Sequence, residues 1–245
     1  MAKVAPRAPL SGPAFIRLLA RLSDARVAQS NHALADRLSQ WIDWTRAVAV
    51  SKALDGKLPD TADLPEPRPL DAHACARVRA DLATSSVADL DALVARLRAD
   101  TRRAAESQQA PAPPDYAPFR QHYLAMQRGM RTATGDLRGR LRDLLALVSA
   151  DMARLAEVDA VMELTLSPRE QALLNTVPGL LGTHFERLRD AAHAPGSAAD
   201  SEAAPRAVSD GWLDIFRKDM QSVLLAELDV RFHPIEGLLA ALRTR

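Results

Sequence analysis

The chain has 245 residues and a formal net charge of +1, from 32 basic and 31 acidic residues, so it has no overall attraction to nucleic acid or acidic membranes. Aromatic residues make up only 4% of the sequence, while Ala, Leu and Arg dominate, which favours helices over strands. The single cysteine, Cys75, excludes an internal disulfide, and no apolar run is long enough to cross a bilayer. Because the N-terminus also lacks the apolar core of a signal peptide, we expect a cytoplasmic protein.

The first half of the chain predicts three helical regions separated by proline-rich segments. A short helix follows Ser11, and apolar spacings of three and four then predict one helix from about residue 30 to Leu54, ended by Gly56. A third helical region covers about 71–107, and Thr84–Ser86 is a candidate break within it. The predicted linkers are 57–70 and 109–118, which each contain four prolines.

The longest periodic signal runs from Phe119 to Leu166 in steps of three and four residues. A single helix over this range would hold about 50 residues and span roughly 75 Å. Three glycines, Gly129, Gly135 and Gly139, weaken its interior, so a bend near 131–139 is a second interpretation. The sequence therefore predicts one long central helix, either continuous or bent.

The C-terminal third predicts further helices. The sequence Ser167-Pro168-Arg169-Glu170 is typical of a helix start, and Pro178-Gly179 should kink or split the helix that follows. Residues 191–209 lack large apolar side chains except Val208, so we predict a disordered loop. A helix from Asp210 to Leu228 comes next, and Pro234 should end it before a short final helix. The fold prediction is a single all-α domain over residues 1–245, a bundle of about six to eight helices.

The motifs of familiar enzymes are absent from the sequence. It contains no GxxxxGK[ST], GxGxxG, HExxH or GxSxG pattern, and its six histidines are scattered singly. A lone histidine is more often a surface or interface residue than a ligand, and Cys75 is best explained as a small apolar residue near a helix start. We therefore predict no catalytic residue, no metal and no cofactor.

Two groups of side chains are candidates for contact with a partner. Trp44 lies at the edge of an apolar stripe that contains Trp41, while Trp212 and Phe216 lie on the last long helix, which could dock into its own bundle or into another protein. Arginines that line one segment could contact an anion or nucleic acid, although mixed charges usually mark a solvated helix face. These arginines are Arg128, Arg131, Arg138 and Arg142.

Four blocks of sequence resemble a bacterial family of unknown function, the one numbered 3348. The blocks are Gly12–Ala20, Leu38–Trp44, Val177–Leu181 and Leu224–Arg231. The resemblance covers the whole chain except the two variable stretches, 57–70 and 191–209, and it carries no catalytic residue. Because members of this family are often encoded beside membrane proton-channel-type and envelope-anchoring proteins, the resemblance implies a cytoplasmic accessory of an envelope-associated complex.

The functional prediction is a non-enzymatic interaction or scaffold protein that binds a protein partner, or a second copy of itself, through its helices. The long apolar stripe and the absence of a catalytic pattern favour it. The alternative is a nucleic-acid-associated protein that uses the arginine-rich central helix, and its affinity would fall steeply with salt.

Overall fold

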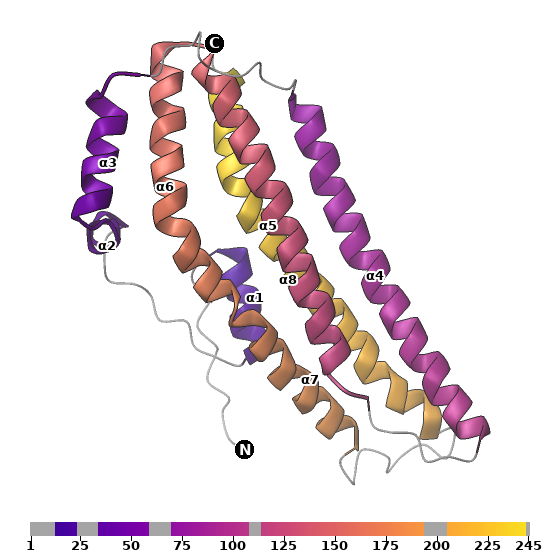
Figure 1. Cartoon of the computed structure of the whole chain (residues 1–245). Helices are drawn as coiled ribbons and strands as arrows, with labels where there is room; N and C mark the ends of the chain where they lie inside the picture. The colour runs from indigo at the N-terminus through magenta and orange to yellow at the C-terminus, as the bar shows by residue number, and fades with distance from the viewer. Residues whose placement is uncertain (1–12, 24–33, 59–69, 108–113, 194–204, 244–245) are drawn as a thin grey trace, which may run out of the picture.

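The computed structural model describes residues 13–23, 34–58, 70–107, 114–193 and 205–243. Within these ranges the chain forms eight helices and no strand, which confirms the predicted all-α bundle (Figure 1). The helices are α1 (Ala14–Ser23), α2 (Leu34–Trp41), α3 (Trp44–Asp55), α4 (Ala72–Glu106), α5 (Ala117–Ala146), α6 (Ala150–Leu174), α7 (Val177–His193) and α8 (Pro205–Arg243).

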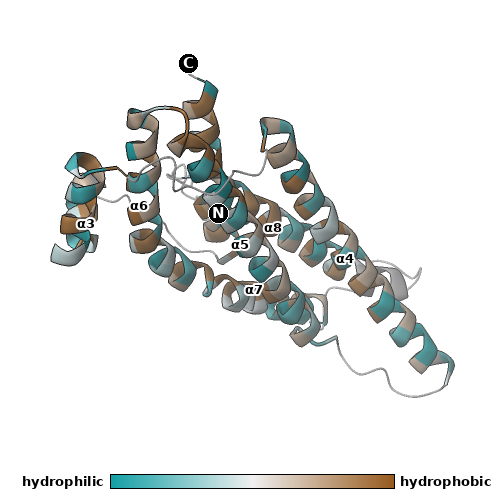
Figure 2. Ribbon diagram, turned by 45° about the horizontal axis from the view of Figure 1, so that its top comes forward, coloured by the Kyte–Doolittle hydropathy of each residue, from teal (hydrophilic) through white to brown (hydrophobic). Residues whose placement is uncertain are grey.

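Helix α5 is the centre of the bundle and lies between α4 and α6, with α8 packed along it (Figure 1). Its apolar residues recur every three or four positions, so they form one stripe on a helix of 3.6 residues per turn. The side chains of this stripe are at most 1% exposed; they are Phe119, Tyr123, Met130, Leu137, Leu141 and Leu145. The long helices therefore carry separate apolar and polar sides (Figure 2).

The predicted central helix exists as α5, but it is shorter than the periodicity indicated. The chain turns back at Leu147–Ser149, and Ser149 caps α6 by accepting a hydrogen bond from the Met152 N–H. α5 and α6 are thus an antiparallel pair, because Arg138 contacts Asp159 while Gln127, three turns earlier, contacts Leu174. The apolar stripe continues across the turn since both helices face the same core. α5 runs through residues 131–139 without a break.

Helix α8 completes the core at one end of the bundle through aromatic contacts. Phe216 is fully buried and packs edge-on against Phe119 and Phe185, with ring centroids 5.1 and 5.0 Å apart. Trp212 meets Phe185 at 5.0 Å, and the Tyr116 hydroxyl donates a hydrogen bond to the Pro178 carbonyl. Five of the ten aromatic residues therefore meet at one place where α5, α7 and α8 join.

The predicted helix over residues 30–54 is divided into α2 and α3. Asp43 stops the first helix and caps the second, because its carboxylate accepts a hydrogen bond from the Arg46 N–H at 2.8 Å. α3 packs on α6, where the Arg154 guanidinium donates to the carbonyls of Leu54 and Gly56. α3 and α6 lie side by side at the edge of the bundle (Figure 1).

Three predicted helix boundaries are wrong because tertiary packing overrides the local signal. α4 runs unbroken through Thr84–Ser86, and the Ser86 hydroxyl donates to the Leu82 carbonyl inside the bundle. Pro168 does not start a helix but lies inside α6, and Pro234 lies inside α8 instead of ending it. The predicted split near Pro178 is confirmed, since α6 ends at Leu174 and α7 begins at Val177.

The predicted linkers and loop lie largely outside the described residues. Of the linkers, residues 57, 58, 70 and 114–116 are described and are not helical, whereas Ala117 and Pro118 begin α5. Residues 191–193 belong to α7 and 205–209 to α8, so the ends of the predicted loop are wrong. The rest of these three segments is not described.

Candidate functional site

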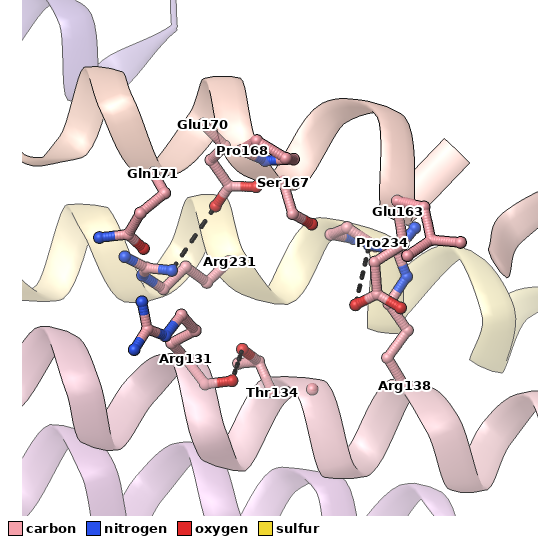
Figure 3. A pocket seen from close by; sticks show the side chains of 12 residues that line it. Arg131, Thr134, Arg138, Glu163, Ser167, Pro168, Glu170, Gln171, Arg231 and Pro234 are labelled. Atoms are coloured by element: carbon pink, nitrogen blue, oxygen red, sulfur yellow. Dashed lines mark hydrogen bonds and ion pairs between the residues drawn. The ribbon is translucent and has the colours of Figure 1, made fainter. Parts of the chain in front are cut away.

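A pocket of about 500 Å³ lies between α5, α6 and α8 (Figure 3). α5 contributes Arg131, Thr134, Gly135 and Arg138, and α8 contributes Arg231 and Pro234. The longest wall comes from α6: Glu163, Leu164, Ser167, Pro168, Glu170 and Gln171. Its size is within the range of small-molecule sites, and its lining combines apolar surface with converging charged groups.

Two of the helices that line the pocket carry an internal proline at this level. Proline has no N–H for the carbonyl four residues earlier and its ring clashes with that carbonyl, so it bends a helix. Pro168 on α6 and Pro234 on α8 both line the pocket. On the third wall, Gly135 leaves open space, because a Cβ added there would meet nothing within 4 Å. The sequence thus opens the bundle locally.

A buried polar network meets the pocket at Arg231. The Glu227 carboxylate is 0% exposed, and its Oε2 accepts hydrogen bonds from the Tyr123 hydroxyl at 2.6 Å and the Gln127 amide at 3.0 Å. Its Oε1 accepts from Nε and Nη2 of Arg231 at 2.9 and 2.7 Å. Burial, followed by the charge of Glu227, raises the pKa of Tyr123 well above its usual range, so the phenol stays a donor. This network supplies the partners that a buried charge needs.

Two guanidinium groups point into the pocket with unused donors. Nη1 of Arg231 lies 3.7 Å from Glu170, beyond hydrogen-bond distance, while its other nitrogens bind Glu227. Among the described residues, the Arg131 guanidinium has no hydrogen-bond or ion-pair partner, and it points toward Arg231 and Gln171 (Figure 3). Arg131 is exposed, so the pocket is open to solvent on its side.

The other predicted arginines differ in their surroundings. Arg138 and Arg142 are bound between α5 and α6 by Asp159 and Glu163, with nitrogen–oxygen distances of 2.5–3.7 Å. Burial alone would lower the pKa of Arg142, but hydrogen bonds to Glu163 and Asp159 outweigh it and raise that pKa. Arg128 is exposed on α5 outside the pocket. The four arginines therefore do not form one anion-binding row, because two of them join helices and only Arg131 and Arg138 line the pocket.

The three predicted partner-binding residues are separated by the fold. Trp44 is 82% exposed on α3, whereas Trp212 is 6% and Phe216 0% exposed. Of the two alternatives for this helix, the structure has the first: α8 docks into its own bundle and buries Trp212 and Phe216 against α5 and α7, so these two residues do not form a partner surface. Trp41 is half-buried, and the Arg169 guanidinium lies 5.5 Å from its ring centroid.

Sequence reasoning missed the burial of one histidine. His184, expected at a surface or interface, is 5% exposed and lies 2.8 Å from Asp219 and 2.9 Å from Arg187. Cys75 is a buried apolar residue as predicted, and burial raises the pKa of its thiol.

Within the described ranges, no three or more His, Cys, Asp or Glu residues are grouped so that they could hold a metal ion. None of the helices in those ranges is both long and apolar enough to span a membrane.

Comparisons with known proteins place the chain in one family. The sequence profile of a family described as "Protein of unknown function (DUF3348)" matches residues 1–244. No curated protein matches the sequence, and no solved structure matches the fold.

Proposed function

The chain belongs to the DUF3348 family of proteins of unknown function, and from this starting point we propose that it is a non-enzymatic interaction protein. Its binding surface is the outward face of α3, and its partner is a protein that presents a helix. The observation that carries the proposal is the 82% exposure of Trp44. Tryptophan is enriched among the residues that dominate binding energy at protein interfaces.

The composition of α3 supports this surface. Apolar residues occupy both sides of the helix, which is typical of a helix with neighbours all round. Ala53 is the one described residue of α3 that is buried. The opposite side carries Trp44, Ala47 and Leu54, at spacings of three and seven residues, and all three are exposed. An apolar face with a helical repeat fits a partner that is itself a helix.

Crosslinking from position 44 would test the proposal. A photoreactive phenylalanine analogue replaces Trp44, and the same analogue at Leu173, 71% exposed on α6, is the matched control. We expect one protein to be crosslinked from position 44 in cells that express the chain naturally, and not from position 173. A membrane or envelope protein would support the accessory role that the family resemblance implies.

Binding of the purified partner provides the second measurement. Trp44→Ala should weaken binding by about 30-fold or more, because an interface tryptophan of this kind contributes about 2 kcal/mol or more. Leu173→Ala should leave binding unchanged, and both variants should keep the circular dichroism of the native chain. Equal adducts from both positions, no adduct, or an adduct only with a second copy would each contradict a heterologous partner on α3.

A further inference from the structure

We propose that the pocket between α5, α6 and α8 binds a small molecule that carries an oxyanion, either a carboxylate or a phosphate. The oxyanion would lie between the guanidinium groups of Arg131 and Arg231. This inference is independent of the function proposed for α3, since the two surfaces share no residue.

The donors for an oxyanion are already in place. Arg231 is held rigidly, because two of its nitrogens bind the fully buried Glu227 carboxylate. Its side chain is 5% exposed, and Nη1, at the pocket wall, has no hydrogen-bond partner within the part of the chain that the structure describes. Arg131 reaches the same pocket from α5 (Figure 3). Guanidinium groups bind carboxylate and phosphate oxygens in pairs, so two of them facing one space favour an anion between them.

The surrounding charges restrict where the anion can bind. Arg138 also lines the pocket, but its nitrogens contact Asp159 at 2.6 and 2.8 Å and Glu163 at 3.7 Å. Glu170 lies 3.7 Å from Arg231 and would repel an anion at that nitrogen. Among the described residues, the donors without a hydrogen bond are therefore those of Arg131 and Nη1 of Arg231, and Glu170 opposes binding there.

The shape of the site favours a small ligand over nucleic acid. The pocket holds about 500 Å³, and Arg231, at 5% exposure, is too deeply placed for the backbone of a duplex. Arg128, one turn before Arg131 on α5, is exposed but does not line the pocket. A polyanion on the helix surface would contact Arg128 and Arg131 alike, whereas a ligand inside the pocket would contact Arg131 alone.

The test is calorimetric titration of the full chain with inorganic phosphate and, separately, with succinate, at constant ionic strength set by sodium chloride. Arg131→Gln should weaken binding by about tenfold or more, because it removes a charged donor. Arg128→Gln is the matched control and should bind as the native chain does. Glu170→Gln should bind about threefold more tightly or better, because it removes a repelling charge. Arg231 is not substituted, since it neutralises Glu227 in the core.

The outcomes separate the alternatives. Saturable binding that is weakened by Arg131→Gln and kept by Arg128→Gln supports the site, and the probe that binds identifies the oxyanion. Equal weakening in both variants would indicate general surface electrostatics and overturn the proposal. No saturable binding of either probe, to the native chain or to Glu170→Gln, would also overturn it.

Discussion

At the scale of single residues, Glu227 is a carboxylate in the middle of an apolar bundle. Tyr123, Gln127 and Arg231 donate all four of its hydrogen bonds, and these donors come from two different helices. A buried ion pair adds little net stability compared with apolar residues of the same shape, but removing one partner leaves an uncompensated charge. We therefore expect the network to contribute more to the register of α5 against α8 than to the net stability of the fold.

Arg231→Met should lower the free energy of unfolding by about 3–5 kcal/mol, because Glu227 would keep a buried charge without a counter-charge. Urea unfolding followed by circular dichroism measures this change. Arg79→Met is the control: Arg79 also pairs with acidic residues of α8, Asp229 and Glu236, but its side chain is 40% exposed. This control should lose at most about 1 kcal/mol.

The double variant Glu227→Gln/Arg231→Met separates charge from packing. A neutral amide at position 227 can still accept from Tyr123 and Gln127, so the double variant should be more stable than Arg231→Met alone. If the effects of the two substitutions on the free energy of unfolding simply add, the uncompensated charge of Glu227 is not the cause of the lost stability.

The sequence identified some residues of the pocket but not the pocket itself. Arg131 and Arg138 were candidates because they follow the charged side of a strongly periodic helix. Glu227 stands between Leu224 and Leu228 in the predicted apolar stripe of its helix, which is a visible signal of a buried charge. Its partner Tyr123 is 104 residues away, so the pairing depends on the packing of α5 and α8, which local periodicity does not encode.

At the scale of helices, periodicity predicted the apolar faces well and the ends poorly. The apolar stripe from Phe119 to Leu166 exists, but it belongs to two helices. The apolar spacing continues through the tight turn between them because both helices face the same core. The turn at Leu147–Ser149 contains neither proline nor glycine, and its local signal is Ser149 alone, a residue type that commonly caps helices. Pro168 was interpreted as a helix start because proline suits that position, and only packing shows that α6 continues through it.

The pairing of α4 with α8 predicts a weak dependence of stability on acidity. A hydrogen bond from Arg98 lowers the pKa of Asp214, with a smaller contribution from the nearby positive charges. A carboxyl group whose pKa is lower in the folded state stabilises the fold at pH values above 3.8, its pKa in the unfolded chain. This stabilisation is lost as the pH falls through the lower pKa of the folded state. Because the Asp214 side chain is 43% exposed, the effect should be small, about 0.5 kcal/mol.

The comparison of native chain and Asp214→Asn measures this effect directly. At pH 5 the native chain should unfold at a higher urea concentration than the variant, and at pH 2.5 the two midpoints should converge. A difference that persists unchanged at pH 2.5 would show that the carboxylate charge is not responsible.

At the scale of the whole molecule, the bundle has a well-packed centre and a lightly attached edge. α5 buries eight residues, whereas α3 buries Ala53 alone among its described residues. Local opening is easiest where few apolar contacts are lost, so stability should differ between these helices. The same light packing leaves Trp44 accessible to a partner.

Hydrogen exchange followed by mass spectrometry should show this difference. We expect the amides of α3 to exchange faster than those of α5 and α8, which are the internal reference for the core. Addition of the partner captured from position 44 should slow exchange in α3 and leave α5 unchanged. Uniform exchange across all three helices would contradict a lightly attached edge.

The position of α8 in the chain has a consequence for how the protein is made. A ribosome synthesises α1 to α7 before the helix that carries Phe216, Met220, Leu224 and Glu227. Until α8 has left the exit tunnel, Phe119 lacks its contact with Phe216, and the Tyr123 hydroxyl lacks the Glu227 carboxylate. A nascent chain that stalls before α8 therefore leaves this part of the core uncovered, and exposed apolar surface of this kind promotes aggregation and binds chaperones.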